Sequence, residues 1–270
     1  MDGKTIFITG STDGHGRYVA VRLAEAGADL ILHGRDRQRA DKVRAEVRAA
    51  SGHDPEVILA DLADLHEVDR LADEVLKRGD RLDAFVSNAG IATAPRGRGL
   101  SKDGVELRFA VNHLAGYHLA RRLTPRLTAS APARVVNVAS AGQQAIDFTD
   151  PMLERGYSGM RAYAQSKLAQ IMFTVDLAEE LRDAGVLVNA LHPATFMNTR
   201  MVRRAGVPPI STVRKGGNAT LRLIADPEVT VSGRYFDGMR EATPNTQAAD
   251  PEARRRLREL SDRLIAEALG

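Results

Sequence analysis

The stretch Thr5-Ile6-Phe7-Ile8-Thr9-Gly10-Ser11-Thr12-Asp13-Gly14-His15-Gly16 decides the fold of this chain. Thr5–Thr9 is a short apolar run that predicts a buried strand, and a helical pattern begins at Tyr18. Between them, glycine permits a tight turn, lets the backbone approach a pyrophosphate and allows the helix to lie close to the strand. Glycine turns also occur for purely structural reasons, but the order strand, turn, helix favours a dinucleotide-binding loop. Its expected residues are Gly10, Ser11, Thr12, Asp13, Gly14, His15 and Gly16.

Short apolar runs alternate with longer segments of helical period along the chain, which is the pattern of βαβ units. Strands are predicted at Thr5–Thr9, Asp29–Leu32, Glu56–Ala60, Ala84–Ser87, Arg134–Ala139, Leu187–Leu191 and Gly233–Phe236. Helices are predicted at Tyr18–Ala26, Arg37–Ala50, His66–Lys77, Val105–Arg126, Tyr163–Asp183, Lys215–Ile224 and Pro251–Leu269. No linker or repeat divides the chain. We therefore expect an α/β Rossmann fold in a single domain over residues 1–270, a doubly wound, seven-stranded parallel sheet with helices on both faces.

Composition narrows the class of protein. Hydrophobic residues make up 43% and charged residues 27% of the 270, which is typical of a globular chain. The 38 basic and 35 acidic residues give a net charge of +3, are spread along the chain and come with only 4% aromatic residues. The densest basic cluster, Arg254–Arg256 with Arg258, lies beside acidic residues and predicts a solvated helix face. We therefore expect no nucleic-acid partner.

Cysteine is absent, so neither disulfides nor thiolate chemistry is possible, and the seven histidines show no metal-ligand spacing. No apolar run approaches the roughly 18 residues of a membrane span, and no signal peptide is visible at the start. We expect no metal, no membrane partner and a cytoplasmic location.

Tyr163 and Lys167 stand four residues apart in a predicted helix and therefore project from one face. A free tyrosine has a pKa of about 10 and is a poor acid near neutrality. A neighbouring ammonium favours the phenolate and lowers that pKa towards the range useful in general acid catalysis. Many solvated helix faces have the same spacing. The pair therefore indicates a catalytic site only in combination with the glycine-rich start of the chain.

Several motifs occur in the order and approximate spacing of the classical short-chain dehydrogenase/reductases. They are Thr9-Gly10-x-x-x-Gly14-x-Gly16, Asn88-Ala89-Gly90, Asn112, Ser140 and Tyr163-x-x-x-Lys167. The resemblance covers essentially the whole chain. The stretch Leu30–Asp36 and the long gap between Ser140 and Tyr163 resemble the retinol-dehydrogenase-like branch.

The resemblance implies a role for each catalytic residue. Tyr163 exchanges a proton with the substrate oxygen, and Lys167 lowers the Tyr163 pKa and binds the nicotinamide ribose. Ser140 hydrogen-bonds the substrate oxygen. Asn112 marks a backbone kink that supports a proton-relay water. Taken alone, Ser140 also fits a strand-end hydroxyl, and Asn112 fits a capping or packed amide.

The resemblance also implies cofactor contacts. Asn88, Ala89 and Gly90 admit the adenosine ribose, although Ser87 replaces the family's first Asn and a plain turn is the alternative. Asp61, followed by Leu62, accepts the adenine amino group, with a helix N-cap as the alternative. His15 replaces the usual aliphatic residue of the glycine motif, so we expect it to be mainly structural.

Cofactor choice depends on the end of the second strand. NAD-specific relatives place an acidic residue there, whereas this chain has Gly34 followed by Arg35, which suits a 2′-phosphate. Asp13 argues against this, because many NADP-binding relatives have a basic residue there, although Arg17 could compensate. We predict NADP rather than NAD, with a surface charge as the alternative role of Arg35.

The segment after the sixth strand departs from the family pattern of Pro-Gly and a later Thr. Here the sequence is His192-Pro193-Ala194-Thr195-Phe196-Met197-Asn198-Thr199, without the glycine and with the threonine one position later. Contacts to the nicotinamide carboxamide are expected from Pro193, Thr195 or Thr199, and the choice stays open. His192 is predicted to be a strand-end packing residue. Residues 193–215 are predicted to form a substrate lid.

Together these features predict hydride transfer between NADP(H) and a small-molecule carbonyl compound or secondary alcohol. A catalytically silent NADP-sensing or scaffolding protein and a lyase or isomerase on the same fold are the alternatives. The resemblance also implies a homodimer or homotetramer.

Overall fold

The protein, described by a computed structural model over residues 1–92 and 97–270, is built on one mixed sheet of eight strands. The strand order is β3-β2-β1-β4-β5-β6-β7-β8, and all neighbours are parallel except β7 and β8. The strands are β1 (Thr5–Ile8), β2 (Asp29–Gly34), β3 (Glu56–Leu59), β4 (Ala84–Ser87), β5 (Ala133–Val138), β6 (Val186–His192), β7 (Tyr235–Asp237) and β8 (Arg240–Ala242).

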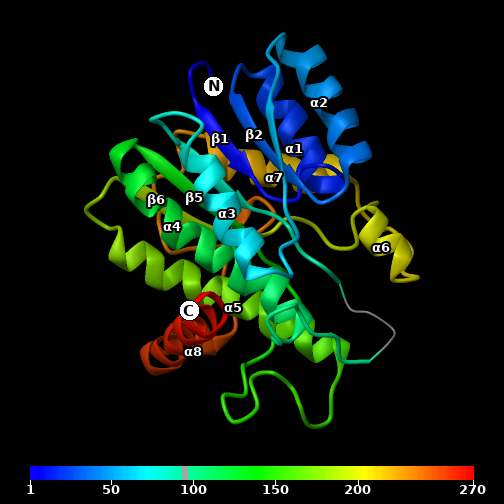
Figure 1. The fold of residues 1–270 in the computed structure, drawn as a ribbon, viewed down its shortest axis with the longest axis vertical. Coiled ribbons are helices and arrows are strands. Elements are labelled where there is room, and N and C mark those ends of the chain that lie inside the picture. The colour runs from blue at the N-terminus through cyan, green and yellow to red at the C-terminus, as the bar shows by residue number, and fades with distance from the viewer. Residues whose placement is uncertain (93–96) are drawn as a thin grey trace.

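Helices cover both faces of this sheet (Figure 1). The α-helices are α1 (Gly14–Glu25), α2 (Arg37–Ser51), α3 (Leu65–Leu76), α4 (Ala115–Ala129), α5 (Gly159–Glu180), α6 (Arg200–Arg204), α7 (Val213–Ala225) and α8 (Pro251–Leu269). A π-helix, η1 (Phe109–Leu114), leads into α4, and a short 3₁₀-helix, η2 (Thr246–Ala249), precedes α8.

The two faces follow from the alternation of side chains along each strand. In β1, Phe7 packs towards α3, α4 and α5, whereas Ile6 and Ile8 pack towards α1, α2 and α7. Because helices cover both faces, both sets are fully buried. Helix α8 packs outside α5, where Leu257 and Leu260 join a third apolar cluster.

Helix starts are fixed by short polar side chains that accept backbone N–H groups. These N-caps are Asp13 of α1, Asp36 of α2, Asp64 of α3, Ser158 of α5, Thr199 of α6, Thr212 of α7 and Asp250 of α8. Gly52 ends α2 in the left-handed conformation, with φ of 75°. Local sequence therefore sets where the helices begin, and burial of their apolar sides sets where they lie.

The predicted doubly wound sheet is confirmed, and all seven predicted strands are present. The sheet has one more strand than predicted, because the chain turns back at Gly238 (φ 58°) and β8 pairs antiparallel with β7. Three residues at a charged edge are too few for the sequence pattern to show. The predicted helix Val105–Arg126 is also interrupted, since η1 precedes α4.

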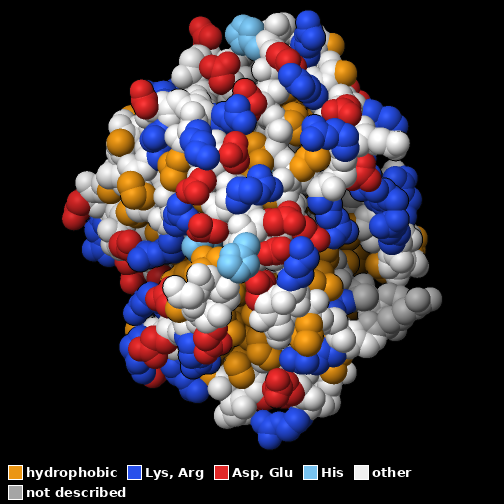
Figure 2. Space-filling model, in the orientation of Figure 1, with side chains coloured by type: hydrophobic (Ala, Val, Ile, Leu, Met, Phe, Trp, Pro, Cys, Tyr) orange, Lys and Arg blue, Asp and Glu red, His pale blue; other side chains and the backbone are white. Residues whose placement is uncertain are grey.

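The surface shows mixed charge. Basic and acidic side chains are interleaved over most of the face in Figure 2, with a basic group over α6. The predicted solvated helix face at Arg254–Arg256 is wrong for Arg254, whose side chain is buried, whereas Arg255 and Arg256 are exposed. Arg254 bonds Asp176 and Glu179, and Arg255 bonds Glu252 and Glu259.

Candidate active site

Segments that follow four neighbouring parallel strands meet at the carboxyl ends of those strands, along one edge of the sheet (Figure 1). The glycine loop follows β1, Asn88-Ala89-Gly90 follows β4, Ser140 follows β5 and Pro193 follows β6. In open α/β sheets this edge is where ligands bind. The fold therefore brings the predicted cofactor residues and the predicted catalytic residues to one place.

The glycine loop has the geometry of a phosphate-binding turn. Gly10 and Gly14 have φ of 63° and 51°, a region in which other residues are strained. A Cβ on Gly16 would lie 2.4 Å from both the Gly10 carbonyl oxygen and Nδ2 of Asn88, so a larger residue does not fit. The first turn of α1 leaves N–H groups without intrahelical partners, and pyrophosphate oxygens can accept them. The loop therefore fits a dinucleotide.

Asn88 joins this loop to the end of β4. Its Nδ2 donates to the carbonyl oxygens of Thr9 and Gly10 at 2.8 and 3.1 Å, and its backbone N–H donates to Thr9 Oγ1 at 3.0 Å. Asn88 Oδ1 lies 2.8 Å from Nδ1 of His15, whose Nε2 lies 3.0 Å from Thr220 Oγ1. Burial lowers the pKa of His15. The His15 side chain thus links β4 to α7, in agreement with the predicted structural role.

His33 on β2 supports the same loop, a role that could not be predicted from the sequence because His33 lies in an apolar run. Nδ1 of His33 accepts the Gly10 N–H at 3.1 Å, so Nε2 carries the proton and donates to the Ala60 carbonyl oxygen at 3.1 Å. Ser11 and His33 also exchange hydrogen bonds, including His33 N–H to Ser11 Oγ at 2.9 Å. Burial lowers the pKa of His33 to about 4, and the bond to Ala60 and the charge of Asp61 oppose this shift only partly. Neutral His33 therefore fixes the loop to β2.

Tyr163 and Lys167 share one face of α5, as predicted. Lys167 Nζ lies 5.9 Å from the centre of the Tyr163 ring. The buried ammonium donates to the Val138 carbonyl oxygen at 2.8 Å and to Gln170 Oε1 at 2.7 Å. Burial lowers the pKa of Lys167 to about 7. Lys167 can therefore exchange a proton near neutral pH.

The pKa of Tyr163 is set differently from the sequence-based expectation. Burial raises the pKa of Tyr163, and the neighbouring Ser140 hydroxyl opposes that rise. Lys167 was predicted to lower this pKa, but its own charge is destabilised by burial and its donors are bound to Val138 and Gln170. Stabilisation of the phenolate in this structure therefore comes from Ser140.

Asn112 lies in η1, where the π-helical turn provides the predicted backbone kink. Its Oδ1 accepts the Ile91 N–H at 2.7 Å, and its Nδ2 donates to the Ile91 carbonyl oxygen at 3.1 Å and to Ser166 Oγ at 2.9 Å. A Cβ on Gly90 would lie 3.2 Å from Asn112 Oδ1 and 3.4 Å from Lys167 Nζ. Asn112 thus connects the loop after β4 to α5, and Gly90 leaves room for this approach.

Arg35 and Arg39 place positive charge after β2. Arg35 is exposed and lies 4.0 Å from Asp61, and Arg39 lies 3.6 Å from Asp13. Arg39 was not identified from the sequence, because it lies in a helix with several exposed arginines. Arg17, predicted to compensate for Asp13, instead bonds Glu46 with both nitrogens at 2.6 and 2.5 Å. Arg39 is therefore the residue that offsets the charge of Asp13.

Asp61 is not a helix N-cap, so that alternative is wrong. Its Oδ1 accepts the Ala63 N–H at 3.1 Å in a tight turn, whereas Asp64 caps α3. Leu62, the next predicted contact, is buried. Asp61 and Leu62 lie directly beyond β3, two strands away from β1.

The residues after β6 separate the two candidate threonines. Thr195 Oγ1 lies 3.0 Å from Nε2 of His192, whereas the side chain of Thr199 lies within 3.4 Å of the Cβ position of Gly14. Thr199 therefore reaches the glycine loop. Pro193 is buried against α7, where a Cβ on Gly216 would lie 3.2 Å from it. Burial also lowers the pKa of His192, consistent with its predicted packing role.

Residues 193–215 form a projecting segment in which residues near the two ends are hydrogen-bonded to each other. Met197 and Ser211 form a β-bridge, and the Phe196 carbonyl oxygen accepts the Ile210 N–H at 3.1 Å. Phe196 has φ of 42°, a strained conformation for a residue other than glycine, yet its side chain is half-exposed. No side chain of α6 is buried. The segment is therefore held together at Met197 and Ser211, and its outer part, α6, is weakly packed.

Across residues 1–92 and 97–270, no three or more His, Cys, Asp or Glu side chains are placed to hold a metal ion. No helix in that part of the chain combines the length and apolar character needed to cross a bilayer.

Comparison with known proteins agrees with this geometry. The family model for short chain dehydrogenases matches residues 4–207. Over 285 residues the chain is 34% identical to retinol dehydrogenase 13 of Homo sapiens, covering 98% of this chain and 85% of that protein. A solved structure from Mycobacterium paratuberculosis aligns with a TM-score of 0.79 and 28% identity over 98% of this chain and 94% of that one. A short chain dehydrogenase from Escherichia coli CFT073, complexed with NADPH, aligns at 0.73 and 26% over 88% and 97%.

Fold and site together define a Rossmann-fold oxidoreductase. The chain belongs to the short-chain dehydrogenase/reductase family, in its retinol-dehydrogenase-like branch.

We expect His33→Asn to flatten the acid side of the stability curve. The pKa of His33 is about 4 in the folded protein and 6.5 for the free side chain, so the unfolded chain takes up the proton first as pH falls. Stability from neutral His33 is complete above about pH 6.5 and is lost towards about pH 4, by roughly 3 kcal/mol. Asparagine can keep accepting the Gly10 N–H through its own Oδ1.

Urea unfolding between pH 4 and 7.5 measures this slope, with His53→Asn on the exposed surface as the matched control. An equal acid slope in wild type and His33→Asn contradicts the assignment.

Proposed function

We propose that this oxidoreductase transfers a hydride between NADP(H) and a carbonyl compound or secondary alcohol. The observation that carries the proposal is the grouping of Ser140, Tyr163 and Lys167 beside the glycine loop at one sheet edge. The glycine cradle fits a dinucleotide, and NADP(H), when bound, supplies or accepts the hydride. The protein then has to bind and orient both reactants and to move one proton.

Tyr163 is the proposed proton donor in reduction and the acceptor in oxidation. Its raised pKa keeps the phenol protonated at neutral pH, which is the form required for donation. Ser140 Oγ accepts the Gly142 N–H at 3.1 Å, so its own proton points elsewhere. We assign that proton to the substrate oxygen and to the oxygen of Tyr163. Ser140 thus orients the substrate and stabilises the phenolate left after proton transfer.

Lys167 and Asn112 are proposed to return the proton. With a pKa of about 7, Lys167 can gain or lose a proton at the working pH, and we assign it to the nicotinamide ribose hydroxyls as well. Asn112, whose amide is bound on both sides, holds η1 in the shape that supports a relay water. Both side chains are buried, so bulk solvent does not compete with this route.

For the cofactor we propose NADP rather than NAD. Arg35 and Arg39 flank the position after β2, where a 2′-phosphate would lie in this fold. Arg39 also offsets Asp13, which was the residue that favoured NAD. Glycine at position 34 is required, because a Cβ there would lie 2.5 Å from the methyl group of Thr12. The Escherichia coli relative complexed with NADPH supports this choice.

Residues 193–215 are proposed to be the substrate lid. The segment begins at the end of β6 and passes the glycine loop at Thr199, so it crosses the proposed cofactor site. Strain at Phe196 and the exposure of α6 mean that little free energy holds the outer part in place. Such segments can order when ligand binds.

Tyr163→Phe should abolish most turnover while leaving cofactor binding nearly intact. The change removes the transferable proton and keeps the ring, and general acid–base groups contribute roughly 10²–10⁴-fold. NADPH oxidation against a panel of ketones and aldehydes measures the rate, and fluorescence titration measures NADPH affinity. Tyr117→Phe, which removes a buried phenol between α4 and α8, is the matched control. Equal rates in wild type and Tyr163→Phe would refute the catalytic role.

Arg35→Asp should reduce the preference for NADP over NAD by roughly ten- to a hundredfold. It removes a charge-assisted hydrogen bond, worth about 1.5–3 kcal/mol, and places like charge against the 2′-phosphate. Dissociation constants for both cofactors give the ratio. Arg37→Asp makes the same charge change on the exposed start of α2 and should leave the ratio near wild type. A wild type that already prefers NAD contradicts the proposal.

Hydrogen exchange should locate the lid. Addition of NADPH is expected to increase protection in residues 195–215 more than elsewhere, because the segment crosses the bound cofactor. Mass spectrometry of peptic fragments with and without NADPH measures it, and α8, which packs on the outside of α5, serves as the internal control. If protection rises instead in residues 142–161, that segment is the better candidate for the lid.

A further inference from the structure

The backbone of Ser140 is held by two side chains that the proposed mechanism does not use. Its carbonyl oxygen accepts a hydrogen bond from Gln143 Nε2 at 3.0 Å and another from the Tyr235 hydroxyl at 3.2 Å. Ser140 lies two residues beyond the end of β5, where the strand pairing with β6 has already ended. The two side chains therefore supply the hydrogen bonds that a neighbouring strand would supply inside the sheet.

These donors come from two segments that are far apart in the sequence. Gln143 lies three residues after Ser140, and its Oε1 accepts the Asn245 N–H at 2.8 Å. Tyr235 is the first residue of β7. The segment around β7 and β8 therefore holds Ser140 from one side, and α5 presents Tyr163 from the other.

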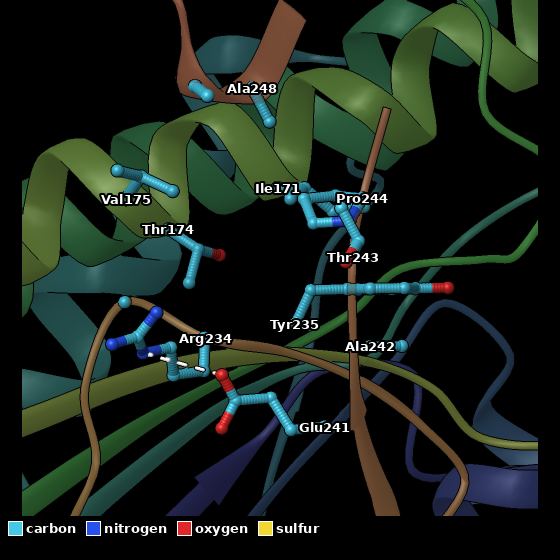
Figure 3. A pocket seen from close by; sticks show the side chains of 12 residues that line it. Ile171, Thr174, Val175, Arg234, Tyr235, Glu241, Ala242, Thr243, Pro244 and Ala248 are labelled. Carbon is cyan, nitrogen blue, oxygen red and sulfur yellow. Dashed lines mark ion pairs between the residues drawn. The ribbon is translucent and has the colours of Figure 1, made fainter. Parts of the chain in front are cut away.

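Tyr235 is suited to be a fixed donor. Burial and then the charge of Asp237 raise the pKa of Tyr235 to about 12, so its hydroxyl stays protonated at working pH. Its ring forms part of the wall of a cavity of about 550 Å³ between α5 and the β7–β8 hairpin. In Figure 3 the ring extends beneath Thr243 and Pro244, and its hydroxyl points away from the Arg234–Glu241 ion pair.

We propose that Tyr235 is a positioning residue, which holds the Ser140 carbonyl so that the Ser140 hydroxyl points at Tyr163 and the substrate oxygen. This assignment rests on the proposed function of Ser140 and Tyr163. The Ser140 hydroxyl already accepts the Gly142 N–H, so rotation of the Ser140–Gly142 turn would redirect its proton. Loss of the Tyr235 hydroxyl leaves Gln143 as the remaining side-chain donor to this carbonyl.

The consequence should be visible at Tyr163. The Ser140 hydroxyl is the neighbouring group that opposes the effect of burial on the pKa of Tyr163. A misdirected Ser140 proton therefore weakens stabilisation of the phenolate. The pKa of Tyr163 should rise, and substrate orientation should become less favourable in the transition state.

Tyr235→Phe tests the proposal because it removes the hydroxyl and keeps the ring. We expect kcat to fall by about two- to tenfold, the range expected for one neutral hydrogen bond, with NADPH affinity unchanged. The ascending limb of the pH–rate profile for alcohol oxidation, in which Tyr163 must first lose its proton, should move to higher pH. The control is Tyr117→Phe, since Tyr117 is also buried and donates one hydrogen bond, at 2.6 Å, to Asp262.

A titration without substrate separates this proposal from the proposed function. The chain has five tyrosines, and ¹³Cζ-tyrosine NMR can follow each phenol, with the Tyr163 signal assigned by its loss in Tyr163→Phe. Tyr163 should titrate at higher pH in Tyr235→Phe than in wild type or Tyr117→Phe. An unchanged Tyr163 titration overturns the positioning role even if no substrate has been found. Equal loss of kcat in the two tyrosine variants also overturns it, because it would indicate general destabilisation.

Discussion

The site depends on the hydrogen bonds that Asn88 makes across the end of β1. Its amide holds two carbonyl oxygens of the glycine loop, and its backbone N–H holds Thr9. The loop can approach this closely because Gly16 has no Cβ. The same junction sets the distance between the cofactor loop and the strand that leads, through Gly90, to Asn112 and Lys167. The glycine loop and the proposed catalytic residues are therefore connected through Asn88.

Burial has opposite effects on the two central groups of the site. It raises the pKa of Tyr163 and lowers the pKa of Lys167, so the neutral forms of both are favoured. A neutral phenol beside a weakly basic amine needs little rearrangement of charge before a proton moves. The Ser140 hydroxyl favours the Tyr163 phenolate, and the Val138 carbonyl oxygen accepts a hydrogen bond from Lys167. Burial therefore sets the direction of both pKa shifts, and the Ser140 hydroxyl limits the size of the shift at Tyr163.

The sequence predicted those features of the fold and site that depend on residues close together in the chain. The glycine loop, the seven parallel strands and the shared helix face of Tyr163 and Lys167 all follow from spacing and periodicity. His33 and Arg39 were missed, because their roles arise from contacts with Gly10 and Asp13, which only the fold brings near. The opposing effect of burial on Tyr163 was missed for the same reason. The cytoplasmic location and the homodimer or homotetramer remain predictions.

The short antiparallel strand at the end of the sheet has a consequence for how copies of the chain meet. β8 consists of Arg240, Glu241 and Ala242, and the opposite edge strand β3 begins with the exposed Glu56. An unpaired edge invites another strand to add to it, and charged side chains oppose that addition. Both edges of this sheet carry such charges. At high protein concentration, these charges therefore oppose the pairing of edge strands from different molecules, which disfavours aggregation.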